Sequence, residues 1–312
     1  MDRLSVIFAG TGGFGVPTLE ALAKNDSVKI PFVITGQDKP SGRKLQVKPS
    51  PIKEAAIKNN LIVHQPMKIA QMKQKIMQEK PDFLLVVAYG EIISSEVFQM
   101  VKYGAVNIHP SLLPKYRGAS PIQETLLRGD TKTGVTWISL SKRMDAGDII
   151  AQEFLPISED DDSPTLAEKL ARLAAEKTFA ILSACHGEPV ESMTLRVKKQ
   201  DERNASYCRK IRKEDGKIDV HRETAEEIIR KIKAYAEWPG CYIFWNGKRL
   251  KIVQARTDEQ KISAGEIKML NDGKILIGTQ KGALLPIVVQ PESKREMKIE
   301  EFLRGEKKIP KL

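Results

Sequence analysis

The chain contains few of the residues that build disulfide frameworks and metal sites. Its 312 residues include three cysteines and four histidines. Cys185, Cys208 and Cys241 are scattered and odd in number, which argues against a disulfide framework and suits a reducing cytoplasm. No His, Cys, Asp or Glu residues have metal-ligand spacing, so we predict no metal. Because no hydrophobic run approaches the length of a membrane span and no signal peptide is visible, we expect a cytoplasmic protein.

The chain also lacks the G-x-S-x-G motif of a serine nucleophile. Instead, an apolar run ends at Asn107-Ile108-His109, and a loop bracketed by Pro110 and Pro114 follows. Alternate residues of a strand face the same side, so the Asn107 amide and the His109 imidazole should point together. An amide and an imidazole at the end of a strand can stabilise an oxyanion and move a proton. This pattern predicts an active site after the strand.

Asp145, in the segment Met144-Asp145-Ala146-Gly147-Asp148, supplies a carboxylate for the same site. Such a group could orient the His109 imidazole or raise its pKa. The three side chains favour direct transfer to an incoming nucleophile over a covalent enzyme intermediate. The alternative is a structural histidine at a strand end, with Asp145 as a helix N-cap.

Strand-like and helical segments alternate in the first part of the chain, which predicts an α/β fold with a doubly wound, mainly parallel sheet of Rossmann-like type. The expected strands are 4–9, 30–35, 61–64, 83–88, 105–109 and 135–140. The expected helices are 18–24, 69–79, 123–128 and a long one from about 163 to 184, with Ser163 as its N-cap. We assign residues 1–197 to this domain and residues 198–205 to a polar linker.

Residues 206–312 have a different pattern. A capping box at Thr224–Glu227 begins a helix. Short expected strands then follow at 241–245, 249–255, 265–269, 275–278 and 284–289, with a hairpin turn at Asn246-Gly247. These features predict a small β-barrel of OB type. The segment has 24 basic and 16 acidic residues, a net charge of +8 out of +11 for the whole chain, and this favours a polyanion such as RNA as partner. Many basic proteins, however, bind no nucleic acid.

A rival interpretation comes from Gly10-Thr11-Gly12-Gly13-Phe14-Gly15, a literal G-x-G-x-x-G between a strand and a helix. That context is typical of an NAD(P)-dependent oxidoreductase. The run at the end of the expected second strand, Ile34-Thr35-Gly36-Gln37, contains no acidic residue, however, and Asp38 lies just beyond it.

The stretch from Asn107 to Pro114, with Arg117-Gly118 and Pro121-Ile122, resembles the signature of the formyltetrahydrofolate-dependent formyltransferases. Within that family the whole chain is similar to the members that act on methionyl-tRNA. Further matching segments are 8–11, 38–43, 49–53, 86–90, 134–136, 145–148, 217–219 and 238–239. The chain departs from the family at Gly12-Gly13, where Pro-Asp is usual, and at Met144, where Leu is common.

The resemblance implies formyl transfer from 10-formyltetrahydrofolate to the α-amine of initiator methionyl-tRNA, giving N-formylmethionyl-tRNA for translation initiation. It implies that the catalytic residues are Asn107, His109 and Asp145. Implied folate contacts are Ser111, Leu112, Leu113 and Pro114, with Val87, Tyr89, Gly90 and Ile92 beside the pterin. Implied contacts with the tRNA or its methionyl end are Lys39, Arg43, Phe14, Gly12 and Gly13. We expect a monomer. A formyltransferase with another acceptor, a hydrolase that releases formate, the oxidoreductase and a non-catalytic RNA-binding protein are the alternatives.

Overall fold

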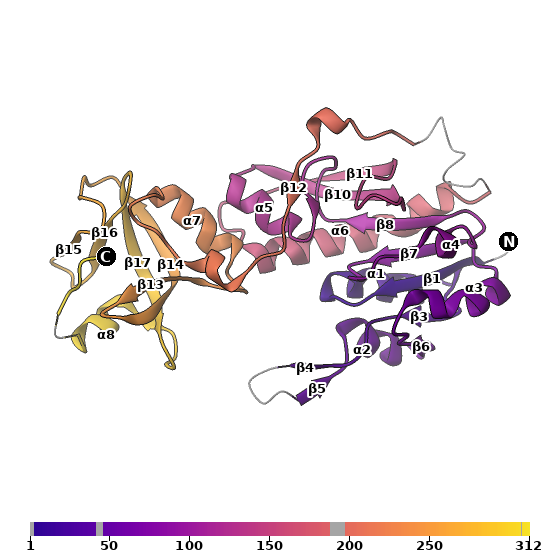
Figure 1. The fold of residues 1–312 in the computed structure, drawn as a ribbon, viewed down its shortest axis with the longest axis horizontal. Coiled ribbons are helices and arrows are strands. Elements are labelled where there is room, and N and C mark those ends of the chain that lie inside the picture. The colour runs from indigo at the N-terminus through magenta and orange to yellow at the C-terminus, as the bar shows by residue number, and fades with distance from the viewer. Residues whose placement is uncertain (1–2, 42–45, 188–196, 307) are drawn as a thin grey trace. The chain divides into compact units, whose positions relative to one another are not determined.

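The computed structural model describes residues 3–41, 46–187, 197–306 and 308–312. The chain forms two compact units (Figure 1). The first unit comprises Met1–Pro121, Lys132–Ile157 and Ala167–Cys208. The second unit comprises Ile122–Thr131, Ser158–Leu166 and Arg209–Leu312. No helix among the described residues is long and apolar enough to cross a membrane.

The first unit is built on a mainly parallel sheet with strand order β11-β10-β8-β7-β1-β3-β6, and β2 also pairs with β1. The chain adds β3 and β6 on one side of β1 and then returns to add β7 and β8 on the other side. This is the doubly wound arrangement expected from the sequence. The last two strands, β10 and β11, run antiparallel. The strand bounds are β1 (Leu4–Gly10), β2 (Val28–Lys29), β3 (Val33–Ile34), β6 (Val63–His64), β7 (Phe83–Val87), β8 (Ala105–His109), β10 (Lys132–Ser139) and β11 (Ile149–Pro156).

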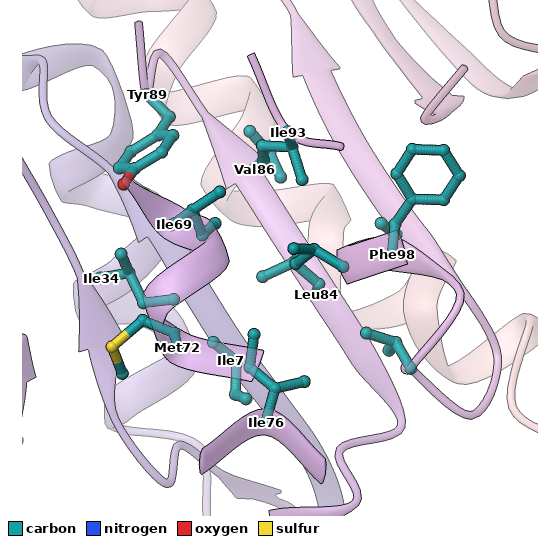
Figure 2. Packing of buried hydrophobic residues seen from close by; sticks show 14 of the residues in the cluster. Ile7, Ile34, Ile69, Met72, Ile76, Leu84, Val86, Tyr89, Ile93 and Phe98 are labelled. Carbon is teal, nitrogen blue, oxygen red and sulfur yellow. The ribbon is translucent and has the colours of Figure 1, made fainter. Parts of the chain in front are cut away.

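Helices cover this sheet because its central strands are apolar on both faces. On one face Leu84 and Val86 of β7 pack against side chains of the covering helices, including Ile76 and Phe98 (Figure 2). Each such buried aliphatic side chain stabilises the fold by about 1.5–3 kcal/mol. The indole Nε1–H of Trp137 donates to Thr178 Oγ1 at 3.0 Å and ties the long helix to β10. The helices of the first unit are η1 (Gly13–Gly15), α1 (Val16–Ala23), α2 (Pro51–Lys58), η2 (Ile69–Met72), α3 (Lys73–Glu79), α4 (Ser95–Phe98) and the larger part of α6 (Ser163–Ala184). From its second residue onward, α5 (Pro121–Arg128) belongs to the second unit, as do the first residues of α6.

Several local details differ from the sequence-based expectations. Residues 36–50, for which no element was expected, contain a hairpin of β4 (Lys39–Ser41) and β5 (Gln46–Lys48). The expected helix 69–79 begins as a 3₁₀ turn and continues as α3. The prediction that Ser163 caps α6 was wrong. Asp162 Oδ1 accepts the Thr165 N–H at 3.0 Å, because the carboxylate one position earlier reaches the third amide of the helix.

The second unit contains an antiparallel sheet with strand order β13-β14-β17-β16-β15, and β18 pairs with β17. Together with the parallel sheet of the first unit, it confirms the predicted fold class. The capping box is also confirmed, since Thr224 N–H donates to Glu227 Oε2 and Glu227 N–H donates to Thr224 Oγ1. The bounds are η5 (Lys213–Gly216), α7 (Ala225–Ala234), β13 (Cys241–Trp245), β14 (Lys248–Asp258), β15 (Ile267–Met269), β16 (Ile275–Gly278), β17 (Ala283–Pro291), β18 (Met297–Lys298) and α8 (Ile299–Arg304).

Candidate active site

Asn107 and His109 lie at the carboxyl end of β8, two residues apart on one strand. The strand is held on both sides, by β7 in parallel and by β10 in antiparallel pairing, in which Thr136 lies opposite His109. The position is therefore rigid, and it is the edge of the sheet at which open α/β sheets bind ligands. His109 is buried, with 4% of its surface exposed, whereas Asn107 is half-buried.

The His109 ring is fixed by a main-chain carbonyl. Its Nε2 lies 2.9 Å from the carbonyl oxygen of Tyr116. Because a carbonyl only accepts, Nε2 carries the proton and Nδ1 keeps its lone pair in the neutral ring. Burial lowers the pKa of His109, and it outweighs the negative charge of Asp145 and the Tyr116 carbonyl, which both raise it. The resting side chain is therefore a neutral imidazole whose Nδ1 is available as a base.

Asp145 completes the group from a loop after β10. Its Oδ2 accepts the main-chain N–H of Gly118 at 2.9 Å and lies 3.6 Å from His109 Nδ1. Its Oδ1 lies 3.5 Å from the Asn107 amide nitrogen. The structure thus brings together all three residues expected to be catalytic. The sequence assigned the orientation of His109 to Asp145, whereas in the structure the Tyr116 carbonyl makes the hydrogen bond to the ring.

Two glycines allow the loops to close on this group. Gly118 has φ +115°, and a Cβ there would lie 2.2 Å from the carbonyl oxygen of Cys208. A Cβ on Gly147 would lie 1.7 Å from the carbonyl oxygen of Ser139. Any side chain at either position would push the Asp145 loop or its Gly118 partner away from the site.

The proline-bracketed loop after β8 carries the four residues first assigned to the folate. Thr136 Oγ1 donates to the carbonyl of Ser111 at 2.6 Å and accepts the N–H of Leu113 at 3.2 Å. Gln152 Nε2 donates to the carbonyl of Leu113 at 2.8 Å. Ser111 and Leu113 are buried, while Leu112 and Pro114 are half-buried. The loop is therefore a firmly held wall beside His109.

The segment after β7 carries the residues assigned to the pterin side. Val87 and Tyr89 are buried, and burial is the main cause that raises the pKa of the Tyr89 phenol. Gly90 has φ +79° and is exposed. Ile92 is 89% exposed, which is unusual for a large aliphatic side chain. Gly90 and Ile92 therefore present an open apolar surface, whereas the side chain of Val87 belongs to the core.

The glycine-rich turn after β1 uses its own amides internally. The N–H groups of Thr11 and Gly12 both donate to the carbonyl of Ala88, at 3.2 and 3.3 Å. A Cβ on Gly10 would lie 2.8 Å from the carbonyl of Val87, so close packing of β1 against β7 accounts for that glycine. A dinucleotide site needs free amides at this turn to bind pyrophosphate. The paired amides speak against the oxidoreductase interpretation.

The residues assigned to the tRNA or its methionyl end lie in two places. Gly12, Gly13 and Phe14 form the turn after β1, where Gly13 is exposed and Phe14 is half-buried. Lys39 is exposed on β4. Arg43 lies outside the described residues.

The base of the hairpin that carries Lys39 is anchored by Asp38. Its carboxylate accepts hydrogen bonds from Lys53 at 2.6 Å and Gln65 at 2.7 Å. The hydrogen bond from Lys53 is the largest cause that lowers the pKa of Asp38. The start of β4 is therefore fixed to α2.

Three groups in the site were not found from the sequence: the Tyr116 carbonyl, the Gly118 N–H and the Gln200 amide. Gln200 Nε2 donates to the main-chain carbonyls of Asp145 at 2.8 Å and Gly147 at 2.7 Å. The first two groups are main-chain atoms, which no residue type reveals. Gln200 is separated from Asp145 by 55 positions, and nothing local in the sequence connects the two. In the part of the chain that the structure describes, no three His, Cys, Asp or Glu residues form a group able to hold a metal ion.

Comparison with known proteins places this site in a family context. Residues 2–182 match the family described as Formyl transferase, and residues 210–307 match Formyl transferase, C-terminal domain. A methionyl-tRNA formyltransferase of Sulfurihydrogenibium sp. (strain YO3AOP1) is 37% identical over 310 residues, covering 97% of each chain. One of Methylacidiphilum infernorum is 39% identical, covering 97% of this chain and 95% of the relative.

A solved structure also shares the fold. It is an N-formyltransferase from Helicobacter canadensis in complex with folinic acid and dTDP-3-aminofucose. It has a TM-score of 0.63 at 20% identity and covers 93% of this chain and 100% of its own. The oxidoreductase alternative finds no support in these matches.

Proposed function

The chain belongs to the methionyl-tRNA formyltransferase family, and we propose that it transfers the formyl group of 10-formyltetrahydrofolate to the α-amine of methionyl-tRNA. The product is N-formylmethionyl-tRNA for translation initiation. The observation that carries the proposal is the convergence of Asn107, His109 and Asp145 at the end of a buried strand. This set suits acyl transfer between two nitrogens, because it offers an oxyanion donor and a base without a covalent nucleophile.

In the proposed reaction the methionyl amine attacks the formyl carbon. A bond forms between that carbon and the amine nitrogen, and the bond to the folate nitrogen breaks. The negative charge that develops on the formyl oxygen is stabilised by the Asn107 amide. His109 Nδ1 accepts a proton from the attacking amine, and the proton then passes to the departing folate nitrogen. Asp145, 3.6 Å away, stabilises the imidazolium while it exists.

Two parts of the first unit are proposed to bind the folate. The held loop Ser111–Pro114 would form one wall, and Gly90 with Ile92 would form the other. Support comes from the exposure of Ile92, because an aromatic ring system placed against it would bury apolar surface that is otherwise in water. Rigid walls matter for the reaction, since the formyl carbon must be held within reach of the amine and of His109.

The tRNA is proposed to contact basic surfaces on both units. On the hairpin, Lys39 lies opposite Lys48, and like charges opposite each other destabilise a strand pair unless an anion neutralises them. On the second unit the Arg249 guanidinium lies 3.8 Å over the Tyr242 ring, next to the exposed Phe244. A basic and aromatic surface of this kind suits the phosphates and bases of RNA. By the family resemblance, Arg43 reads the acceptor end.

We also propose that the enzyme works as a monomer in the cytoplasm. The three cysteines are few, far apart in the sequence and buried, which suits a reducing compartment.

The proposed function is tested by following labelled formyl from 10-formyltetrahydrofolate to purified initiator Met-tRNA. We expect stable formyl-methionyl-tRNA with the enzyme and none without it. Release of free formate would instead indicate a hydrolase. In a parallel reaction with an amino-sugar nucleotide added, label on the sugar nucleotide and none on the tRNA would indicate another acceptor. Either of these results, or no turnover of the folate, would contradict the proposal.

A further inference from the structure

Residues 200–208, here called the brace, run along the Asp145 loop and the segment 116–118. Part of this stretch was expected to be a linker. In the structure the brace belongs to the first unit, which extends to Cys208. It contains η4 (Glu202–Asn204) and β12 (Tyr207–Cys208), and β12 pairs in parallel with β9 (Arg117–Gly118). The brace therefore contacts both segments that hold the catalytic side chains.

Gln200 connects the brace to the Asp145 loop through both ends of its amide. The nitrogen donates to the carbonyls of Asp145 and Gly147 at 2.8 and 2.7 Å. The oxygen accepts from Arg117 Nε at 2.9 Å and Nη2 at 2.7 Å. All four hydrogen bonds act on one planar group, so the position of the Asp145 main chain is tied to the position of Arg117. Asp145 itself has φ +52°, a conformation that a non-glycine residue holds only with external support.

Arg117 is the fixed point of this arrangement. Its side chain is fully buried, and the guanidinium also donates to both carboxylate oxygens of Glu202, at 2.9 and 3.2 Å, and to Tyr207 OH at 3.0 Å. Hydrogen bonds from Arg117, and then from Arg143, lower the pKa of Glu202 to about 2. The Glu202 carboxylate is consequently charged at neutral pH, so the ion pair with Arg117 is kept there.

The brace also sets the two main-chain groups that hold the catalytic side chains. Ser206 Oγ accepts the N–H of Tyr116 at 2.9 Å, and the carbonyl of Ser206 accepts the N–H of Arg117 at 2.9 Å. The same segment also contacts the catalytic side chains. The Tyr116 carbonyl accepts a hydrogen bond from His109 Nε2, and the Gly118 N–H donates to Asp145 Oδ2. The brace thus holds segment 116–118 by hydrogen bonds, and this segment in turn holds His109 and Asp145.

We propose that Gln200 is a positioning residue for formyl transfer: its amide nitrogen holds the Asp145 main chain so that the carboxylate meets both the Gly118 N–H and His109. This inference rests on the proposed function for its kinetic consequence, but its structural consequence stands alone. Without the Gln200 donor the carbonyls of Asp145 and Gly147 lose a shared partner, and the loop relaxes from its φ > 0 conformation. The carboxylate then moves relative to His109, and a displacement of about 1 Å near a reacting group can cost up to ~100-fold in rate.

Three variants separate this role from simple folding support. Gln200→Glu keeps an oxygen for Arg117 but replaces the donor by a second oxygen that faces two carbonyls. Gln200→Met keeps the volume and removes both functions. Asn204→Ala is the matched control, because Asn204 is exposed on the same segment and its amide binds only Asp201 among the described residues.

We expect Gln200→Glu and Gln200→Met to lower kcat by ~10-fold or more, with KM for 10-formyltetrahydrofolate and Met-tRNA within about twofold of wild type. Asn204→Ala should match the wild type. Wild-type kcat in Gln200→Glu would overturn the proposal, because it would show that Gln200 serves only Arg117. An unchanged kcat in Gln200→Met would overturn it as well.

Hydrogen exchange gives a readout that does not depend on the reaction. We expect faster exchange in residues 143–148 and at the Gly118 amide in both Gln200 variants, and no change in the Asn204→Ala control. Unchanged exchange in either Gln200 variant would overturn the positioning role. If the wild-type enzyme formylated no Met-tRNA, the proposed function would fail, while faster exchange would still support the role of Gln200 in holding the loop.

Discussion

The catalytic centre of the first unit and the proposed RNA surface of the second unit differ in how far they are exposed to water. In the first unit the groups around the catalytic centre are withdrawn from water, since the Arg117 side chain is fully buried and His109 is nearly so. In the second unit the candidate binding groups lie at the surface, as with Phe244, which is 49% exposed. Burial strengthens electrostatic interactions and lets main-chain groups fix side chains, which suits chemistry. Exposure allows a large polyanion to exchange its counterions for side chains, which suits binding.

This contrast is tested most strongly by Asp145→Asn. The variant keeps the shape and an oxygen for the Gly118 N–H, but it removes the charge that stabilises a protonated His109. We expect kcat to fall by ~100-fold or more, the scale of lost acid–base assistance, with folate binding and thermal stability nearly unchanged. Asp160→Asn is the control, because it removes the charge of an exposed carboxylate far along the chain from the catalytic group. Turnover close to wild type, measured with saturating substrates, would exclude the role of Asp145.

The second test concerns the close packing of the main chain at Gly118 against Cys208, beside the buried catalytic group. Gly118→Ala places a Cβ 2.2 Å from the Cys208 carbonyl at a residue with φ +115°. An alanine there has the energetic cost of the left-handed conformation and, in addition, that of the steric overlap. We therefore expect the free energy of unfolding, measured by urea denaturation, to fall by about 2–4 kcal/mol. Gly273→Ala is the control, since its φ is also positive but no atom lies within 4 Å of the added Cβ. Equal losses in the two variants would contradict the packing argument.

The third test is the pH dependence of stability. Burial holds the pKa of His109 in the folded protein below its usual value of 6.5. Below about pH 6.5 the unfolded chain therefore binds more protons than the folded chain, and stability falls as the pH decreases towards the folded pKa. We expect the wild type to lose stability relative to His109→Gln when the pH is lowered from 7 to 5. Parallel Tm curves for the two proteins would show that His109 does not titrate in this way.

The smallest effect on the kinetics is expected for a variant of the proposed RNA surface of the second unit. Arg249→Gln removes the cation that lies over Tyr242 and should raise KM for Met-tRNA by about 3–10-fold at 0.15 M salt, with kcat unchanged. The slope of log KM against log salt concentration should decrease by about one, the change expected when one phosphate contact is lost. Arg222→Gln is the matched control, because it removes the same charge from an exposed arginine of this unit. An equal rise in KM for the two variants would show that tRNA binding depends on the net charge of this unit and not on the surface around Arg249.

The sequence predicted those parts of the molecule whose cause is local. The β8 strand was predicted with its observed bounds because its alternation and its terminal proline loop are both contained in 105–114. The capping box of α7 was likewise found from four consecutive residues. Gln200 and the Tyr116 carbonyl were missed because their significance depends on contacts between distant segments. The β4–β5 hairpin was missed because its polar composition is equally typical of a solvated loop.

Because residues 200–208 belong to the first unit, the position of the brace has a practical consequence for building chimeras of related enzymes. A chimera joined at the polar stretch near residue 198 would import a foreign Gln200–Cys208 segment beneath the Asp145 loop, and its catalytic group would be assembled from two parents. A junction placed after Cys208 would instead transfer the whole brace with the sheet that it supports. The modular boundary useful to an engineer therefore lies several residues later than the change in amino-acid composition suggests.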